Sequence, residues 1–145
     1  MKNKKIIISI AIFLGIMIIT FTKISHSDKG SIDIPKKNEV SFIEIYDDYI
    51  SDISKYHVIE SDKDIEEIYD ILLSAKRKKN MQSDNDSPTN VNGEVTKIVI
   101  KDSANNEIIL FVYKRNYGKF YIERPYEGIY EISNEEYDNL IQYFK

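Results

Sequence analysis

Three consecutive segments rich in β-branched and aromatic residues constrain the fold more than any other feature of this sequence. They cover residues 95–101, 107–114 and 119–124. Such residues favour the pleated, half-buried surface of a β-sheet. Only short stretches with turn-forming residues separate the segments, so consecutive strands must turn back on one another. We therefore predict an antiparallel meander at the centre of the fold.

Weaker strand signals flank this meander. From Ser41 to Tyr46 apolar and polar residues alternate, and residues 56–59 form a second, shorter β-rich stretch. Residues 128–132 follow a proline and have the composition of a last short strand. Together with the meander, these segments predict an antiparallel sheet of four to six strands.

Two segments show the spacing of amphipathic helices. Residues 62–76 place apolar side chains three and four positions apart, and Ser61 stands where an N-cap is expected. Ser133 and Glu136 form the pattern of a capping box before a C-terminal helix. The buried face of that last helix is predicted to contain Tyr137, Leu140, Ile141 and Phe144. We therefore expect an α+β domain with two amphipathic helices on one face of the sheet.

The N-terminal 24 residues differ from the rest of the chain. Three lysines within the first five residues precede an uncharged run over residues 6–22, which Lys23 closes. As a helix this run is roughly 25 Å long at about 1.5 Å per residue, and flanking lysines that reach the headgroups can extend it across a bilayer. The basic N-terminus predicts that the remaining chain lies outside the cell membrane. A secretory signal cleaved before Asp28 is the competing interpretation, and it predicts a secreted domain.

These features divide the chain into three parts. Residues 1–24 are the expected single transmembrane helix or signal segment, and residues 25–40 are a polar tether that contains Gly30 and Pro35. Residues 41–145 form the extracytoplasmic α+β domain. This length suits a single hydrophobic core, since domains typically have about 100–150 residues.

Composition excludes several classes of site. The chain has no cysteine, which excludes disulfides, thiolate metal sites, a cysteine nucleophile and an acylated lipoprotein anchor. His26 and His57 match no metal-ligand spacing, so we expect no metal and no cofactor. Four lysines and no acidic residue precede Asp28, so the remaining chain holds 16 basic and 24 acidic residues, a net charge of −8. No nucleic-acid partner is expected, because phosphate binding needs clustered cations.

One basic cluster interrupts this acidic chain, at Lys76-Arg77-Lys78-Lys79. It comes at the end of the helix expected over residues 62–76, where cations complement the helix dipole. A structural role is the favoured interpretation, and binding of a phospholipid or another polyanion is the alternative.

The segment YIERPYEGIYEI, residues 121–132, combines three tyrosines with one proline and one glycine. Pro125 removes a ladder donor and Gly128 permits backbone angles that other residues resist, so we expect a bend between two strands. A bend does not account for Tyr126 and Tyr130. Tyrosines combine apolar area with a hydroxyl, which suits both a binding surface and the edge of a small core. The core interpretation is favoured, and the binding surface is kept as the alternative.

The string ERPYEGIY at residues 123–130, with NDSP at residues 85–88, resembles the DUF5301 family, a group of small domains of unknown function from Firmicutes. The pattern of that family carries an E-Q-P-Y-x-G-I-Y motif and an N-D-x-P element after the first helix. Arg124 stands where glutamine is usual, and the resemblance spans roughly residues 41–145. It implies an exported or membrane-anchored domain, in some relatives joined to membrane metallopeptidases of the antibiotic-sensing type. No activity is implied.

No segment has the pattern of a catalytic site. His57 is interpreted as an edge-strand histidine, and no serine has the surroundings of a nucleophile. The favoured hypothesis is therefore a membrane-anchored, extracytoplasmic, non-catalytic interaction or sensory module that binds an envelope protein or peptide. A cell-envelope hydrolase with a carboxylate site is the alternative. The candidate binding residues are Asn85, Asp86, Glu123, Arg124, Tyr126 and Tyr130.

Overall fold

The computed structural model describes residues 30–47, 56–89, 91, 93–115 and 118–144. The anchor expected over residues 1–24 lies outside the described residues. Within the described part of the chain, no helix has the length and apolar character that crossing a membrane requires.

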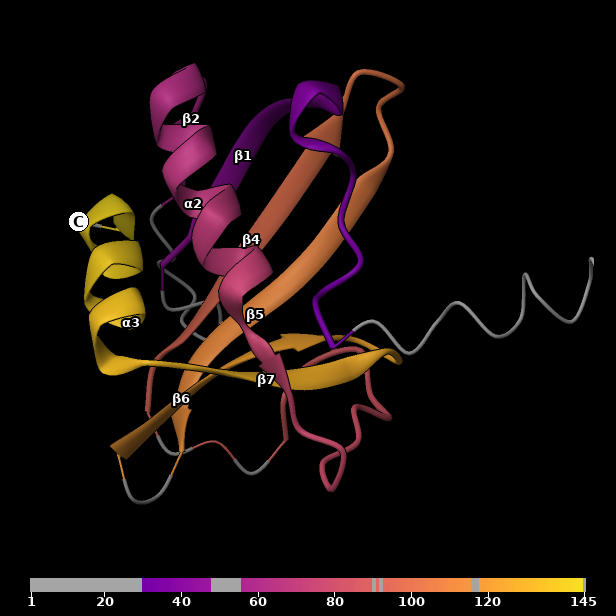
Figure 1. Cartoon of the computed structure of the whole chain (residues 1–145), viewed down its shortest axis with the longest axis vertical. Helices are drawn as coiled ribbons and strands as arrows, with labels where there is room; N and C mark the ends of the chain where they lie inside the picture. The colour runs from indigo at the N-terminus through magenta and orange to yellow at the C-terminus, as the bar shows by residue number, and fades with distance from the viewer. Residues whose placement is uncertain (1–29, 48–55, 90, 92, 116–117, 145) are drawn as a thin grey trace, which may run out of the picture.

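A single open antiparallel sheet forms the body of the domain (Figure 1). The described residues contain the strands β1 (Val40–Tyr46), β2 (Tyr56–Ile59), β3 (Lys76–Arg77), β4 (Val95–Asp102), β5 (Glu107–Arg115), β6 (Lys119–Arg124) and β7 (Gly128–Ile132). Their order in the sheet is β2-β1-β4-β5-β6-β7-β3. The predicted meander is confirmed as β4-β5-β6, and the short strand expected over residues 128–132 is β7, which pairs with β6. The predicted strand number of four to six is wrong, because the sheet has seven strands, with β3 added at one edge.

Helix α2 (Asp62–Ser74) ends before the basic cluster begins. Ala75 has extended backbone angles, and Lys76 and Arg77 then pair with Glu131 and Tyr130 of β7. The prediction that the cluster closes the helix is therefore wrong: its first two residues are an edge strand.

The two helices begin differently. Helix α3 (Asn134–Ile141) opens with the predicted capping box, in which the Ser133 Oγ accepts a hydrogen bond from the Glu136 N–H at 3.1 Å. Ser61 occupies the N-cap position of α2, but its side chain makes no capping hydrogen bond. The expected capping role of Ser61 is therefore not realised.

Both faces of the sheet bury apolar side chains. Helices α2 and α3 lie on the same face, as Figure 1 shows, and a large core fills the space beneath them. It includes Ile43, Ile45, Ile68, Leu72, Ile98, Ile100, Leu110, Ile122, Tyr130 and Leu140. A smaller core on the opposite face contains Val95, Phe111, Tyr113, Tyr121 and Ile129. Side chains alternate along β6, since Ile122 faces the helices and Tyr121 faces the smaller core.

The segment between β3 and β4 covers the smaller core. Met81 and Val91 from this segment pack against its buried residues. This mostly polar segment therefore contributes two apolar contacts, which hold it against the sheet.

The chain before β1 also packs against the domain. Ile32 is buried in the helix-side core, and the Tyr69 hydroxyl of α2 donates a 2.8 Å hydrogen bond to the Pro35 carbonyl. At the start of this segment the Arg77 N–H donates to the Gly30 carbonyl at 3.1 Å. The described part of the expected tether therefore runs along the domain surface, from the edge strand β3 at Gly30 to the start of β1.

Candidate functional site

Glu123 is a buried carboxylate on the face of the sheet opposite the helices. Only 4% of the residue is exposed. One carboxylate oxygen accepts a hydrogen bond from the Tyr113 hydroxyl at 2.7 Å, and the other accepts from the Ser83 hydroxyl at 2.6 Å. Burial, reinforced by the hydrogen bond to Glu123, raises the pKa of Tyr113 well above its usual value. Glu123 therefore joins β5, β6 and the loop that carries Ser83.

The turn between β6 and β7 has an unusual backbone. The Glu127 N–H donates to the Arg124 carbonyl at 3.1 Å, and Pro125 takes the second position of this four-residue turn. Tyr126, at the third position, has a φ of +62°. Type II turns require a positive φ there, and glycine or asparagine usually supplies it. A tyrosine in this conformation is uncommon and costs free energy, and strain of this kind is concentrated at functional positions.

Gly128 has a different role from the expected one. Its φ lies outside the left-handed region, so the bend does not depend on its conformational freedom. A Cβ at this position would lie 3.2 Å from the Arg77 Nε and 3.5 Å from the Tyr130 ring. The glycine therefore provides space for the Arg77 side chain beside the turn.

Tyr126 connects the motif at residues 123–130 to the NDSP segment at residues 85–88. Its side chain is one of the few large apolar ones exposed among the described residues, with 63% of the residue accessible. Its hydroxyl donates a 2.8 Å hydrogen bond to the Asp86 carboxylate, which raises the pKa of Tyr126. This hydrogen bond places Asp86 at the turn, and its neighbour Asn85 is exposed.

Tyr130 is separated from this surface. It is 3% exposed and belongs to the core beneath the helices. The favoured sequence interpretation, a tyrosine at the edge of a small core, describes Tyr130, whereas Tyr126 has the exposure of a contact residue.

Arg124 links the turn to the N-terminal segment. Its guanidinium pairs with the Glu127 carboxylate at 2.8 Å and lies 3.7 Å from the Asp33 carboxylate. It also donates a hydrogen bond to the Asp33 carbonyl. The arginine that replaces the usual glutamine of the motif therefore anchors both the turn and the chain before β1.

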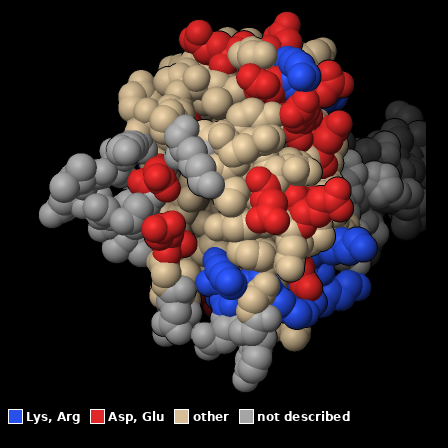
Figure 2. Space-filling view, turned by 90° about the vertical axis from the view of Figure 1, so that its left-hand side faces the viewer, with Lys and Arg blue, Asp and Glu red and all other residues tan. Residues whose placement is uncertain are grey.

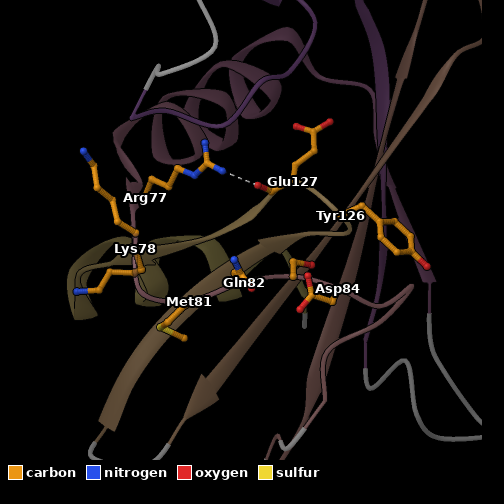
Figure 3. Close-up of a pocket in the computed structure, with 9 residues that line it drawn as sticks. Arg77, Lys78, Met81, Gln82, Asp84, Tyr126 and Glu127 are labelled. Atoms are coloured by element: carbon orange, nitrogen blue, oxygen red, sulfur yellow. Dashed lines mark hydrogen bonds between the residues drawn. The ribbon is translucent and has the colours of Figure 1, made fainter.

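Two hollows border the turn. The first has a volume of about 420 Å³ and lies between the basic segment and the loop, as Figure 3 shows. The Arg77 Nη2 donates a 2.8 Å hydrogen bond to the Glu127 carbonyl across its rim. The second hollow, of about 390 Å³, is bordered by Asp86, Arg124 and Pro125. Tyr126 is one of the residues that line the first hollow.

Carboxylates border both hollows, and those at the second belong to Asp86, Glu107 and Glu127. Asp84 and Glu127 both line the first hollow, but Figure 3 shows their carboxylates pointing to opposite sides. Both oxygens of Glu123 are already engaged by hydroxyl groups. His57 lies on the edge strand β2, at the end of the sheet opposite β3.

Ser83, Tyr113 and Arg77 are parts of this site that sequence reasoning missed. Ser83 stands in a polar loop with nothing to distinguish it from its neighbours. Tyr113 was detectable in principle, because the strand alternation places it on the same face as Glu123 once β5 and β6 are paired.

Comparison with protein families identifies the family of this chain. A family described as a domain of unknown function (DUF5300), DUF5301, matches residues 28–131. The chain belongs to the DUF5301 family. The match starts before the range of 41–145 that the motifs indicated and ends before α3. Comparison with curated proteins gives no match, and comparison with solved structures gives none either.

Proposed function

We propose that this DUF5301 domain is a non-catalytic interaction or sensory module, held outside the cell membrane by an N-terminal helix over residues 1–24. The apolar run and its flanking lysines support the anchor and its orientation. The partner is an envelope protein or peptide that docks on the β6-β7 turn.

The conformation of Tyr126 is the observation that carries the proposal. An exposed aromatic ring is held in a strained backbone conformation, and its hydroxyl is fixed by Asp86. Folding stability alone gives no reason to expose this ring, since glycine would suit the turn better. Aromatic side chains that project from a rigid support are typical anchors of protein interfaces.

The surroundings of Tyr126 suit a peptide or a protein segment. Tyr126 lines the first hollow, and Arg124 and Asp86, which border the second, carry charges of opposite sign. The buried hydrogen bonds of Glu123 hold the loop and the sheet together beneath this surface, so it is formed before the partner arrives.

Site-specific photo-crosslinking in intact cells tests the proposal. A benzophenone amino acid replaces Tyr126 in the full-length protein, and the same substitution at Tyr56 serves as a matched control. Tyr56 is 56% exposed and lies on β2, at the far end of the sheet. We expect a discrete adduct with an envelope protein from position 126 and none from position 56. The same set of adducts from both positions would contradict the proposal.

A further inference from the structure

The cations of the basic cluster are largely without ion-pair partners. Most other cations of the described residues pair with carboxylates, as Lys37 does with Glu66 and Lys101 with Glu107. Among those residues, no salt bridge involves Lys76, Arg77 or Lys79. All three are exposed. An otherwise acidic domain therefore carries a concentrated positive edge.

Figure 2 shows how this charge is distributed. Lys and Arg side chains gather at the lower end of this face, while most Asp and Glu side chains lie above them. Lys78 and Lys119 both pair with Glu131, at 2.6 Å and 3.1 Å, which neutralises that carboxylate. The separation of charge gives the domain a preferred orientation in front of an anionic surface.

The chain enters the domain at this same edge. The Arg77 N–H donates to the carbonyl of Gly30, the first described residue. Five residues lie between Ile24, the end of the proposed anchor, and Gly30, and the six Cα–Cα steps that join them reach at most about 20 Å. The basic edge is therefore tied close to the membrane surface if the anchor spans it.

We propose that Lys76, Arg77 and Lys79 hold the domain against its own membrane by binding the phosphates of anionic lipid headgroups. This inference rests on the proposed anchor, which brings the edge within reach. Lys and Arg are standard ligands of phosphate oxygens, and an anionic leaflet attracts cations within about one Debye length, ~8–10 Å. Lys76 and Arg77 form the short edge strand β3, and Lys79 follows two residues later, so all three lie at or next to the edge of the sheet.

Lysine acylation of the full-length chain in vesicles tests this docking surface. The protein is reconstituted in vesicles of phosphatidylcholine alone or of phosphatidylcholine with phosphatidylglycerol. A membrane-impermeant amine-reactive ester then labels the outward-facing domains, and mass spectrometry gives the rate at each lysine. Lys63 is the internal control, because its side chain is 82% exposed at the opposite end of α2.

We expect acylation of Lys76 and Lys79 to be about fivefold slower with phosphatidylglycerol, the ratio that corresponds to ~1 kcal/mol per cation at an anionic surface. High salt should abolish the difference. In the parent chain, acylation of the neighbouring Lys78 should also be slower with phosphatidylglycerol. In the K76Q/K79Q variant this difference at Lys78 should disappear. Equal rates in both lipids, or equal slowing at Lys63, would overturn the proposal. If soluble polyphosphate slows the acylation of these lysines and phosphatidylglycerol does not, the ligand of the basic edge is a phosphate polymer and not a lipid.

Vesicle flotation separates this inference from the anchor on which it rests. A chain that fails to float with phosphatidylcholine vesicles lacks a functional anchor, which contradicts the proposed function. If that chain still floats with phosphatidylglycerol vesicles, the basic edge binds lipid without the anchor. A chain that floats with both but shows no lipid-dependent acylation has the anchor and lacks the docking surface.

Discussion

The Tyr113 hydroxyl donates a 2.7 Å hydrogen bond to the Glu123 carboxylate inside the smaller core of the sheet. Ser83 donates to the other oxygen of the same side chain, so the Glu123 carboxyl group is buried with two hydroxyl partners. Buried carboxylates persist in proteins when hydrogen bonds compensate for lost hydration. Glu123, the first residue of the family-like motif, therefore fixes the loop to the sheet beneath the proposed binding surface.

Replacing Glu123 with alanine should destabilise the domain by about 2–4 kcal/mol. The change leaves the hydroxyls of Tyr113 and Ser83 without their acceptor and opens a small cavity. Urea unfolding followed by far-UV circular dichroism measures the free energy of unfolding. Glu60→Ala is the matched control, because Glu60 is exposed and its loss should change stability by no more than about 0.5 kcal/mol. A similar effect from both substitutions would show that the Glu123 hydrogen bonds contribute little.

The raised pKa of Tyr113 predicts a loss of stability at alkaline pH. An unfolded tyrosine titrates near pH 10, whereas burial and the Glu123 hydrogen bond keep Tyr113 protonated in the folded state. Below pH 10 both states hold the proton, so the stabilisation is fully present. Above pH 10 the unfolded chain releases a proton that the folded chain retains, and the free energy of unfolding falls.

The variant Tyr113→Phe separates the contribution of Tyr113 to this alkaline loss of stability from the contributions of the other tyrosines and of the lysines. The variant should be less stable than the parent at neutral pH, but its stability should fall less steeply as the pH rises above about 10. Urea midpoints measured from pH 8 to pH 11 provide the comparison. Parallel profiles for the two proteins would show that Tyr113 does not titrate differently in the folded state.

Much of this fold follows from local sequence patterns. The β4-β5-β6-β7 meander was predictable because strand propensity, alternation and turn chemistry agree over residues 95–132. The edge strand β3 was not, because the pairing of Lys76 and Arg77 with β7 is a tertiary interaction between polar residues. A basic cluster after a helix gives the same local signal whether it extends the helix or starts a strand.

The candidate site was likewise only partly predictable from the sequence. Asp86 and Tyr126 were both candidate binding residues, and the hydrogen bond between them joins segments 40 positions apart. The positive φ of Tyr126 was not predictable, since a neighbouring glycine offered the easier way to turn. The contact of Gly128 with Arg77 likewise depends on where β3 lies.

Substitution of the two tyrosines Tyr126 and Tyr130 should change the stability of the domain by very different amounts. Tyr130→Ala should cost about 3–5 kcal/mol, because it removes a buried aromatic ring from the core beneath the helices. Tyr126→Gly should stay within about 1 kcal/mol of the parent, since relief of the left-handed strain offsets the lost hydrogen bond to Asp86. Thermal and urea unfolding measure both. A large loss of stability in Tyr126→Gly would assign that ring a structural role and weaken the proposed binding role.

The two helix N-caps offer a matched pair of substitutions. Ser133→Ala should destabilise the domain by about 1 kcal/mol, because the Ser133 side chain accepts the Glu136 N–H in a complete capping box. Ser61→Ala should have a much smaller effect, since the Ser61 side chain makes no capping hydrogen bond at the start of α2. Both serines are exposed and precede a helix of the same domain, so burial and cavity effects are similar. Urea unfolding under identical conditions compares the two variants, and equal losses would mean that Ser61 caps its helix in solution.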